Sequence, residues 1–268
     1  MTTSDESRPT VVVPPAPVLI ARSVWLEIRR REEYQALFVP MAVYLAFAFG
    51  ARLVGANQRE AQSLMLNMGL SMSAALSAIL TLVTAARLIP AEIESGTLYP
   101  LLAKPVHRYE VLLGKFLASV AAGWGAFAVF TLLTRLFTVG DPEQSSAMFL
   151  QACTLQLVAL FLLCSISFLF SMLLPKSAAI LLAGLLYFGW TPLANIVRST
   201  TRSTWCGWIL EVALSFVPDF SQLTLLQRFT DGGSRLPWGE CFLLGVYGVV
   251  PALLALAASN FLFERKSL

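Results

Sequence analysis

The sequence is poor in the residues that build catalytic and metal sites, and it is poor in charge. Only 13% of its 268 residues are Asp, Glu, Lys or Arg, and it holds a single histidine, His107. A haem or metal site built on paired histidines is therefore excluded within one chain. The four cysteines form no Cys-x-x-Cys pair, and a Gly-x-Ser-x-Gly nucleophile elbow is missing. We expect no catalytic residue, no metal and no cofactor in this chain.

The sequence also lacks a phosphate-binding loop of its own. Gly114 and Lys115 match the end of such a loop, but the motif needs glycine five residues before Gly114 and serine or threonine after Lys115. Tyr109 and Phe116 occupy those two positions, so ATP cannot bind in that way. We expect Lys115 instead to extend from its apolar segment to the cytoplasmic surface.

Apolar residues are abundant and come in long blocks. They make up 57% of the chain, and the mean hydropathy is +0.71, which is unlike an ordinary soluble domain. A helix that crosses a bilayer needs roughly 20 mostly apolar residues. We therefore predict an all-α membrane protein with six transmembrane helices. The six blocks are Leu37 to Val54, Leu64 to Ile89, Val111 to Val139, Met148 to Leu174, Ala178 to Val197 and Cys241 to Phe263.

Basic residues are distributed unevenly between the two ends of these blocks. If the six blocks cross the membrane in turn, one side receives the segments before the first block and after the second, fourth and sixth. Twelve Lys and Arg residues lie in or beside these segments, and seven lie on the other side. Cytoplasmic segments carry an excess of positive charge. The distribution predicts a multi-pass protein of the inner membrane with both termini in the cytoplasm. The net charge of +3 reflects this bias and indicates no nucleic-acid partner.

The N-terminal region divides into two parts. Residues 1–17 are polar and proline-rich, without the apolar core of a cleavable signal peptide, and we expect a disordered cytoplasmic tail. Residues 18–35 combine apolar side chains, Trp25 among them, with a run of arginines. This pattern predicts an interfacial helix, although a basic anchor for the first span explains it equally well. Residues 18–268 are expected to form a single transmembrane domain.

One face of the second block is lined by small and polar residues. They recur at spacings of three and four, which places them on one side of a helix. The stripe predicts either a wall of a transport path or close helix packing, and Asn67 and Ser71 are the better candidates for a path. Large residues on another side are expected to face lipid. The stripe consists of Asn67, Ser71, Ala74, Ala78, Thr81 and Ala85, and the other side of Met65, Met72, Leu76, Ile79 and Val83.

The fifth block carries a second polar face. Tyr187, Thr191 and Asn195 follow Gly184 at helical spacing, and Pro192 lies among them. Proline removes a backbone donor and kinks a helix. Polar groups beside a kink predict a cavity or a subunit contact, and a packed bundle interior is the alternative.

Residues 198–238, between the fifth and sixth blocks, are too many for a simple turn. Apolar residues at helical spacing on both sides of Pro218 predict two short interfacial helices on the outer face, anchored by tryptophans. We expect an external gate, or a lid that only covers the bundle. Cys206 and Cys241 lie in or near this segment, and the sequence does not decide whether they form a disulfide.

Residues 90–115 form the longest charged and turn-rich interruption on the predicted cytoplasmic side. Glu92 and Glu94 precede a Gly-Thr pair, a short amphipathic turn follows, and Pro105 restarts the chain. Glycine and proline at such places fix changes of chain direction. The segment is therefore predicted to hold a short, rigid helix crosswise at the membrane surface, where another protein can bind it.

This segment resembles the first cytoplasmic loop of the ABC-2 type permeases, the membrane subunits of a class of ATP-binding-cassette exporters. Its place between the second and third spans is similar as well. One position departs from the family, because His107 stands where a small hydroxyl residue would cap the next helix better. The resemblance rests on Glu92, Glu94, Gly96, Thr97 and Leu98, on Leu101, Leu102, Ala103, Pro105, Val106 and Arg108, and on Leu113, Gly114 and Lys115.

The resemblance implies a permease subunit of an ABC transporter, expected to be an exporter. ATP and magnesium would bind to a separate cytoplasmic ATPase, and two permease chains, as a homodimer, would form the translocation path among membrane lipids. Residues 18–35 would be an elbow helix beside the ATPase, and residues 90–110 the coupling loop. The residues implied in ATPase coupling are Glu92, Glu94, Gly96, Thr97, Leu98, Pro105 and Arg108. The residues predicted from the polar faces to line the path or a subunit interface are Asn67, Ser71, Tyr187, Thr191 and Asn195.

Three other classes of function stay open. A structural membrane subunit that does not transport would lack substrate-stimulated ATPase activity when it is reconstituted with its partner. Inverted repeats and intramembrane carboxylates would favour an ATP-independent carrier, and we see neither in the sequence. An intramembrane hydrolase would need a nucleophile or metal ligands that are missing. The substrate is not identified by any cluster or motif in the sequence.

Overall fold

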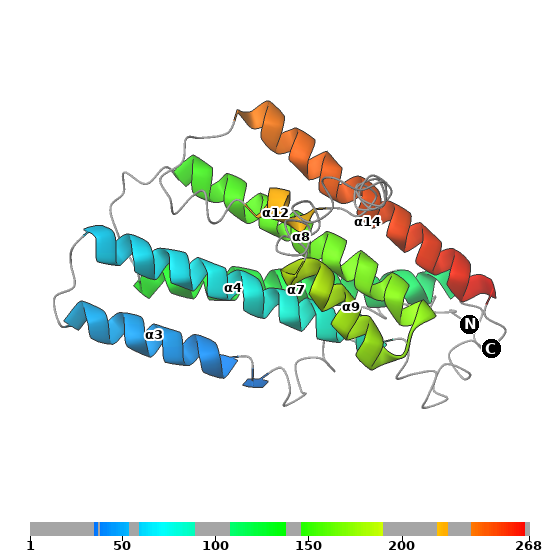
Figure 1. Ribbon diagram of the computed structural model, residues 1–268, viewed down its shortest axis with the longest axis horizontal. Helices are drawn as coiled ribbons and strands as arrows, with labels where there is room; N and C mark the ends of the chain where they lie inside the picture. The colour runs from blue at the N-terminus through cyan, green and yellow to red at the C-terminus, as the bar shows by residue number, and fades with distance from the viewer. Residues whose placement is uncertain are drawn as a thin grey trace, which may run out of the picture.

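The helices of this chain form where the apolar blocks lie in the sequence. The computed structural model describes residues 35–36, 38–53, 59–88, 108–137, 146–189, 219–224 and 237–265. In these residues every regular element is an α-helix (Figure 1). The helices are α3 (Phe38–Leu53), α4 (Arg59–Leu88), α7 (Arg108–Phe137), α8 (Ser146–Leu173), α9 (Lys176–Phe188), α12 (Phe220–Leu223) and α14 (Trp238–Arg265).

Four of the described helices are long and apolar enough to cross a membrane. The membrane-length segments are Leu64–Leu88, Tyr109–Leu136, Phe149–Leu173 and Trp238–Phe263, in α4, α7, α8 and α14. They coincide with the second, third, fourth and sixth predicted blocks. The shorter apolar helices α3 and α9 lie within the first block and at the start of the fifth. The chain is therefore a multi-pass α-helical membrane protein, and the six-span layout stays a prediction.

The helices α3, α4, α7, α8 and α9 run in alternate directions along the chain, and α14 runs parallel to α8 (Figure 1). α3 and α4 form a hairpin in which the Tyr44 hydroxyl donates to the Met65 carbonyl oxygen at 2.5 Å. α4 and α7 are antiparallel neighbours, with Thr81 of α4 against Gly123 of α7. The end of α4 and the start of α7 consequently lie at the same end of the bundle.

A two-residue turn joins α8 to α9. Pro175 has φ −57° and ψ 151°, which is the extended conformation that proline favours. Leu174 N donates to Phe170 O at 2.8 Å, which closes the last turn of α8. The chain therefore reverses direction sharply, and α9 packs back against α8 and α4 (Figure 1).

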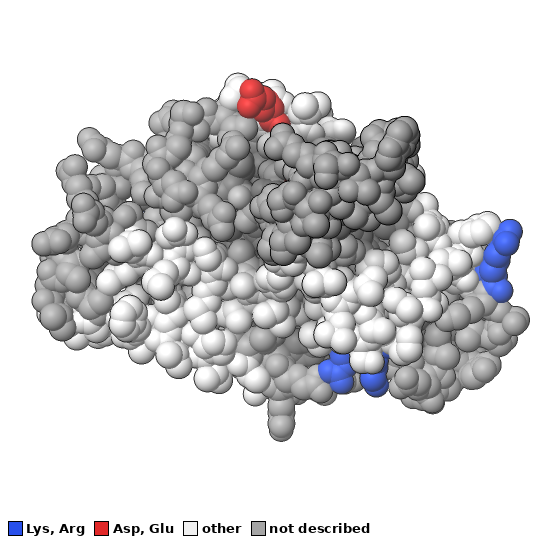
Figure 2. All heavy atoms as spheres, viewed as in Figure 1, with Lys and Arg blue, Asp and Glu red and all other residues white. Residues whose placement is uncertain are grey.

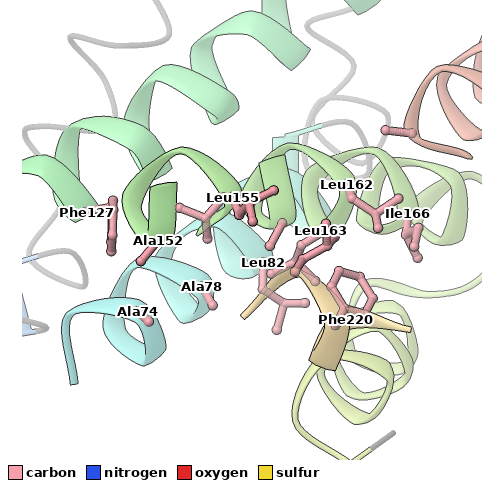
Figure 3. Close-up of a cluster of buried hydrophobic side chains, with 14 of the residues drawn as sticks. Ala74, Ala78, Leu82, Phe127, Ala152, Leu155, Leu162, Leu163, Ile166 and Phe220 are labelled. Carbon is pink, nitrogen blue, oxygen red and sulfur yellow. The ribbon is translucent and has the colours of Figure 1, made fainter. Parts of the chain in front are cut away.

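The largest buried cluster lies where α4 meets α8. Ala74 and Ala78 of α4 face Ala152 and Leu155 of α8, and Phe220 of α12 closes the cluster farther along (Figure 3). Small side chains on both helices let their axes approach closely, which is how helices gain contact in a membrane. The small-residue stripe of α4 is thus a packing surface over most of its length.

The prediction that the large residues on another side of α4 face lipid is wrong for Leu76, which is 7% exposed. The other four residues of that side are half-buried, namely Met65, Met72, Ile79 and Val83. Leu76 packs in a buried cluster with Met41 and Tyr44, because α3 covers this side of α4. Apolarity cannot separate lipid-facing from protein-facing positions, since lipid tails are as apolar as leucine.

Candidate functional site

The residues predicted to couple this chain to an ATPase fall almost wholly outside the described residues. Arg108 is the exception, since it begins α7, although its side chain is not described. The structure therefore shows the helices on either side of the predicted coupling loop, with α4 ending at Leu88 and α7 beginning at Arg108. The predicted coupling residues outside the described part are Glu92, Glu94, Gly96, Thr97, Leu98 and Pro105.

The two helices that flank this loop are packed very closely. A Cβ atom at Gly123 of α7 would overlap Oγ1 of Thr81 on α4. At Gly69 of α4, a Cβ atom would lie 2.5 Å from the Tyr44 hydroxyl and would overlap the methyl group of Thr134. Only glycine permits these approaches, so displacement of α4 along α7 would meet immediate steric resistance.

Hydroxyl groups fill much of the contact between α4 and α7. Thr81 donates to the Ser77 carbonyl oxygen at 2.7 Å, and Thr84 donates to the Leu80 carbonyl oxygen at 2.6 Å. These hydroxyls are satisfied within their own helix, as is common for serine and threonine in membrane spans. They make the seam compact and polar without requiring water inside it.

One hydroxyl pair links the two helices directly. Ser73 Oγ of α4 lies 3.3 Å from Thr134 Oγ1 of α7. Both residues are fully buried. Each hydroxyl also has a carbonyl oxygen of its own helix within hydrogen-bond distance, that of Gly69 for Ser73 and that of Phe130 for Thr134. Since a hydroxyl carries one proton, one of the two donates to the other, which donates to its own carbonyl oxygen. The interhelical contact fixes the register of α4 against α7 near the end of the bundle opposite the predicted coupling loop.

Asn67 and Ser71 lie on a different face of α4. Ser71 is exposed and Asn67 half-buried, and the Ser71 hydroxyl donates to Asn67 Oδ1 at 3.3 Å. Leu64 and Met68, each 63% exposed, flank the pair. The structure thus divides the predicted stripe into an exposed polar part and a buried part made of alanines and Thr81.

Tyr187 of α9 lies inside the bundle, apart from that face. Its hydroxyl accepts a hydrogen bond from Gln156 Nε2 of α8 at 2.8 Å. Its ring packs edge-on against Phe188 and Phe220, with centroid distances of 4.8 and 5.2 Å. Asn67 pairs with Ser71, whereas Tyr187 pairs with Gln156, and that these residues share one path stays a prediction. Thr191 and Asn195 lie outside the described residues.

Gln156 is a buried polar residue that the sequence analysis did not select. Its side chain is fully buried, and its Oε1 has no hydrogen-bond partner within the described part of the chain. Its amide lies inside one of the most apolar blocks of the sequence. Polar groups at such depth usually pair with another group or serve a function, so this amide could have been selected from the sequence. Gln156 and Tyr187 therefore form a polar contact between α8 and α9.

Lys115 of α7 is a second group whose position was not foreseen. The expectation that it extends to the cytoplasmic surface is wrong, because its side chain is only 2% exposed. Ser119, one turn later, is fully buried and donates to the Lys115 carbonyl oxygen at 3.0 Å. The cation therefore lies inside the bundle, near the end at which α7 begins.

Basic residues gather at the end of the bundle where α7 starts, and the carboxylate of Glu110 in the first turn of α7 lies there as well. Arg87 and Arg265 lie in the last turns of α4 and α14, and Lys176 begins α9, at the end where α7 starts. Glu240 lies in the first turn of α14, at the opposite end, where Figure 2 shows acidic atoms away from the basic ones. At that end the guanidinium of Arg135 rests over the Phe149 ring, 4.4 Å from its centroid.

Within the ranges that the structure describes, no group of three or more His, Cys, Asp or Glu residues is placed to hold a metal ion. Cys153, Cys164 and Cys241 are free thiols. Cys206, the other member of the disulfide considered from the sequence, lies outside the described residues.

The comparisons with known proteins identify the family. No match is found among curated proteins. The family model described as ABC-2 family transporter protein matches residues 34–268, which include all the described helices. Because this match covers most of the sequence, the chain belongs to the ABC-2 transporter family and is a permease of that family.

Proposed function

We propose that this permease forms half of a dimeric translocation path and exports its substrate when a separate cytoplasmic ATPase binds residues 90–110. ABC-2 membership supports a general association with such an ATPase. The chain itself supplies membrane-spanning helices and no nucleotide-binding motif. The chemical step, ATP hydrolysis, would therefore occur in the partner, and this chain would convert the partner's motion into a change of helix packing.

The observation that carries the proposal is the tight seam between α4 and α7. Residues 89–107 connect these two helices directly. Gly123 against Thr81 and Ser73 against Thr134 hold them in one register. A force applied to the connecting segment would accordingly move both helices together. Such a rigid pair can bias a bundle between two discrete packings.

The gathering of basic residues at one end of the bundle supports a cytoplasmic position for the connecting segment. Arg87, Lys115 and Lys176 lie at the same end of the bundle as this segment. Positive charge accumulates on the cytoplasmic side of inner-membrane proteins. We infer that residues 89–107 face the cytoplasm, where an ATPase can reach them, and that both termini lie on that side.

The exposed polar face of α4 supports a partner chain or an aqueous path at that surface. Hydrocarbon offers no hydrogen bonds to the Asn67 amide or to the exposed Ser71 hydroxyl. We infer that a second permease chain covers this face, with the translocation path between the two copies. Tyr187 lies inside the bundle with Gln156, and its role in the path stays a prediction together with those of Thr191 and Asn195.

Two substitutions in the connecting segment test the coupling. Glu94→Ala removes a carboxylate that a basic partner can bind, and Gly96→Val strains the predicted turn. We expect both variants to insert normally and to lose at least about tenfold in transport-linked ATP hydrolysis, a change of ~1.4 kcal/mol. The measurement is substrate-stimulated ATPase activity of the permease reconstituted with its ATPase, alongside abundance in the membrane.

Matched controls lie in the first turn of α14, at the opposite end of the bundle. Glu240→Ala removes a carboxylate there, and Gly239→Val adds a side chain where no atom lies within 4 Å of the added Cβ. Both controls should keep full coupled activity. If Glu94→Ala and Gly96→Val also keep it, residues 90–110 are a tether and the proposal fails. If substrate never stimulates the ATPase in the unmodified complex, the chain is a structural subunit.

A further inference from the structure

Lys115 is a buried cation at the end of the bundle where residues 89–107 connect α4 to α7. Its side chain is 2% exposed, and it lies about two turns after the start of α7. Removing an ammonium group from water is costly unless polar groups bind it. The predicted extension of Lys115 to the cytoplasmic surface is inconsistent with this burial, so the position requires another account.

The packing of α4 against α7 shows what lies opposite Lys115. Gly123 of α7 contacts Thr81 of α4, and the two helices are antiparallel. Lys115 lies eight residues before Gly123 on α7. Because the two helices are antiparallel, the matching position on α4 lies eight residues after Thr81, at residue 89. Position 89 directly follows Leu88, the last residue of α4. Lys115 therefore lies level with the C-terminal end of α4.

A buried cluster agrees with this register. Ala85, in the last turn of α4, packs in the same cluster as Leu112 and Phe116, which lie three residues before and one residue after Lys115 on α7. The Phe116 ring also meets Phe161 and, at 5.6 Å between centroids, Phe168 of α8. The last turn of α4 and the first turns of α7 therefore lie side by side. Helical side chains lean towards the N-terminus of their helix, which directs the ammonium group of Lys115 towards the end of α4.

We propose that Lys115 is a positioning residue whose ammonium group binds the C-terminal end of α4. The last four carbonyl groups of a helix have no amide partner within it, and they carry partial negative charge. An ammonium group donates up to three hydrogen bonds, so one lysine can bind several of these oxygens. Lys115 ties α7 to the point at which the chain leaves α4. This inference rests on the proposed function and deepens it, because the tie joins both helices to the start of the coupling segment.

The first test uses the purified permease alone, without any ATPase. Lys115→Met keeps the length of the side chain and removes its charge, and Lys115→Gln keeps donor groups without charge. Both are expected to speed amide hydrogen exchange in the last turn of α4, Ala85–Leu88, by about tenfold, because that turn loses its capping cation. Lys115→Arg should restore slow exchange. If Lys115→Met does not accumulate in the membrane, Lys115→Gln carries the test.

The control is Lys176→Met, which removes an exposed cation at the same end of the bundle. It should leave exchange in the last turn of α4 unchanged. Equal acceleration in this control would show a general charge effect and overturn the proposal. Unchanged exchange in both neutral Lys115 variants would overturn it as well.

The second test separates this inference from the proposed function. In the complex with the ATPase, Lys115→Gln should lower substrate-stimulated hydrolysis about tenfold, with Lys115→Arg restoring it, if the tie transmits motion. Faster exchange in the permease with full coupling in the complex would support the tie as a structural contact and show that the coupling tested at Glu94 and Gly96 does not pass through it. Slow exchange with lost coupling would overturn the tie and leave the coupling role standing.

Discussion

Two helices of equal membrane-spanning ability, α4 and α14, occupy very different environments. In the most apolar stretch of α4, 67% of the residues are buried against protein, whereas in α14 the share is 22%. α4 carries Ser73, Ser77, Thr81 and Thr84, all fully buried. α14 presents large apolar residues outwards instead, with Leu254 66% exposed.

The difference shows which sequence feature marks a protein-facing helix in a membrane. Neither helix is driven inwards by hydrophobicity, because lipid is as apolar as the bundle interior. α4 is surrounded because small and hydroxylated residues lie on several of its sides, which allows α3, α7, α8 and α9 to approach. α14 has one narrow strip of this kind, in which Gly248, Ala252 and Ser259 are buried. It therefore contacts α8 along one side and leaves the rest exposed.

The comparison is tested most severely by truncating one leucine on each helix. Leu70→Ala on α4 removes a fully buried side chain and leaves a cavity, which should lower the free energy of unfolding by about 2–3 kcal/mol. Leu254→Ala on α14 removes an exposed side chain and should change it by less than about 0.5 kcal/mol. Unfolding by SDS titration in mixed micelles measures both values. Equal losses would show that another chain or segment covers α14 in solution.

Two glycines sharpen the comparison at the level of a single methyl group. Alanine is the better helix former by about 1 kcal/mol, so Gly245→Ala on α14, where the added Cβ meets nothing within 4 Å, should be neutral or stabilising. Gly123→Ala on α7 places a methyl group on Thr81 of α4 and should cost about 1–2 kcal/mol. The same SDS titration reads both variants. A stabilised Gly123→Ala protein would show that the α4–α7 seam is looser than described.

The sequence predicted the class of fold well and the neighbours of each helix poorly. The all-α membrane class and the positions of α4, α7, α8 and α14 follow from long apolar runs, because length and apolarity alone decide whether a segment can span a bilayer. The outward side assigned to Leu76 was wrong, because a single helix pattern does not reveal that α3 covers it. The polar character of Asn67 and Ser71 was visible, but the hydrogen bond between them and the exposure of Ser71 depend on which helices pack against α4.

Buried polar residues were the least predictable part of the candidate site. The burial of Lys115 depends on the register between α4 and α7. Gly123 and Thr81, which are 42 residues apart in the sequence, set this register. Gln156 was visible as an amide in an apolar run, but its partner Tyr187 depends on the turn between α8 and α9. The family resemblance indicates which loop meets an ATPase and gives no information on these interior contacts.

The smallest expected effect concerns the Gln156–Tyr187 hydrogen bond, a side-chain contact that joins α9 to the buried side of α8, whereas Tyr247 on the exposed face of α14 accepts from a backbone group, the Asp219 N–H. Tyr187→Phe removes the hydroxyl and leaves Gln156 Nε2 without its acceptor, which should cost about 1 kcal/mol. Gln156→Leu removes the amide, including an Oε1 atom that has no partner among the described residues, and should cost less. Adding Gln156→Leu to Tyr187→Phe should recover part of the loss, since no polar group then stays unsatisfied. A double-mutant cycle by SDS titration measures the coupling energy, and strictly additive losses would show that the hydrogen bond contributes nothing to the packing of α9.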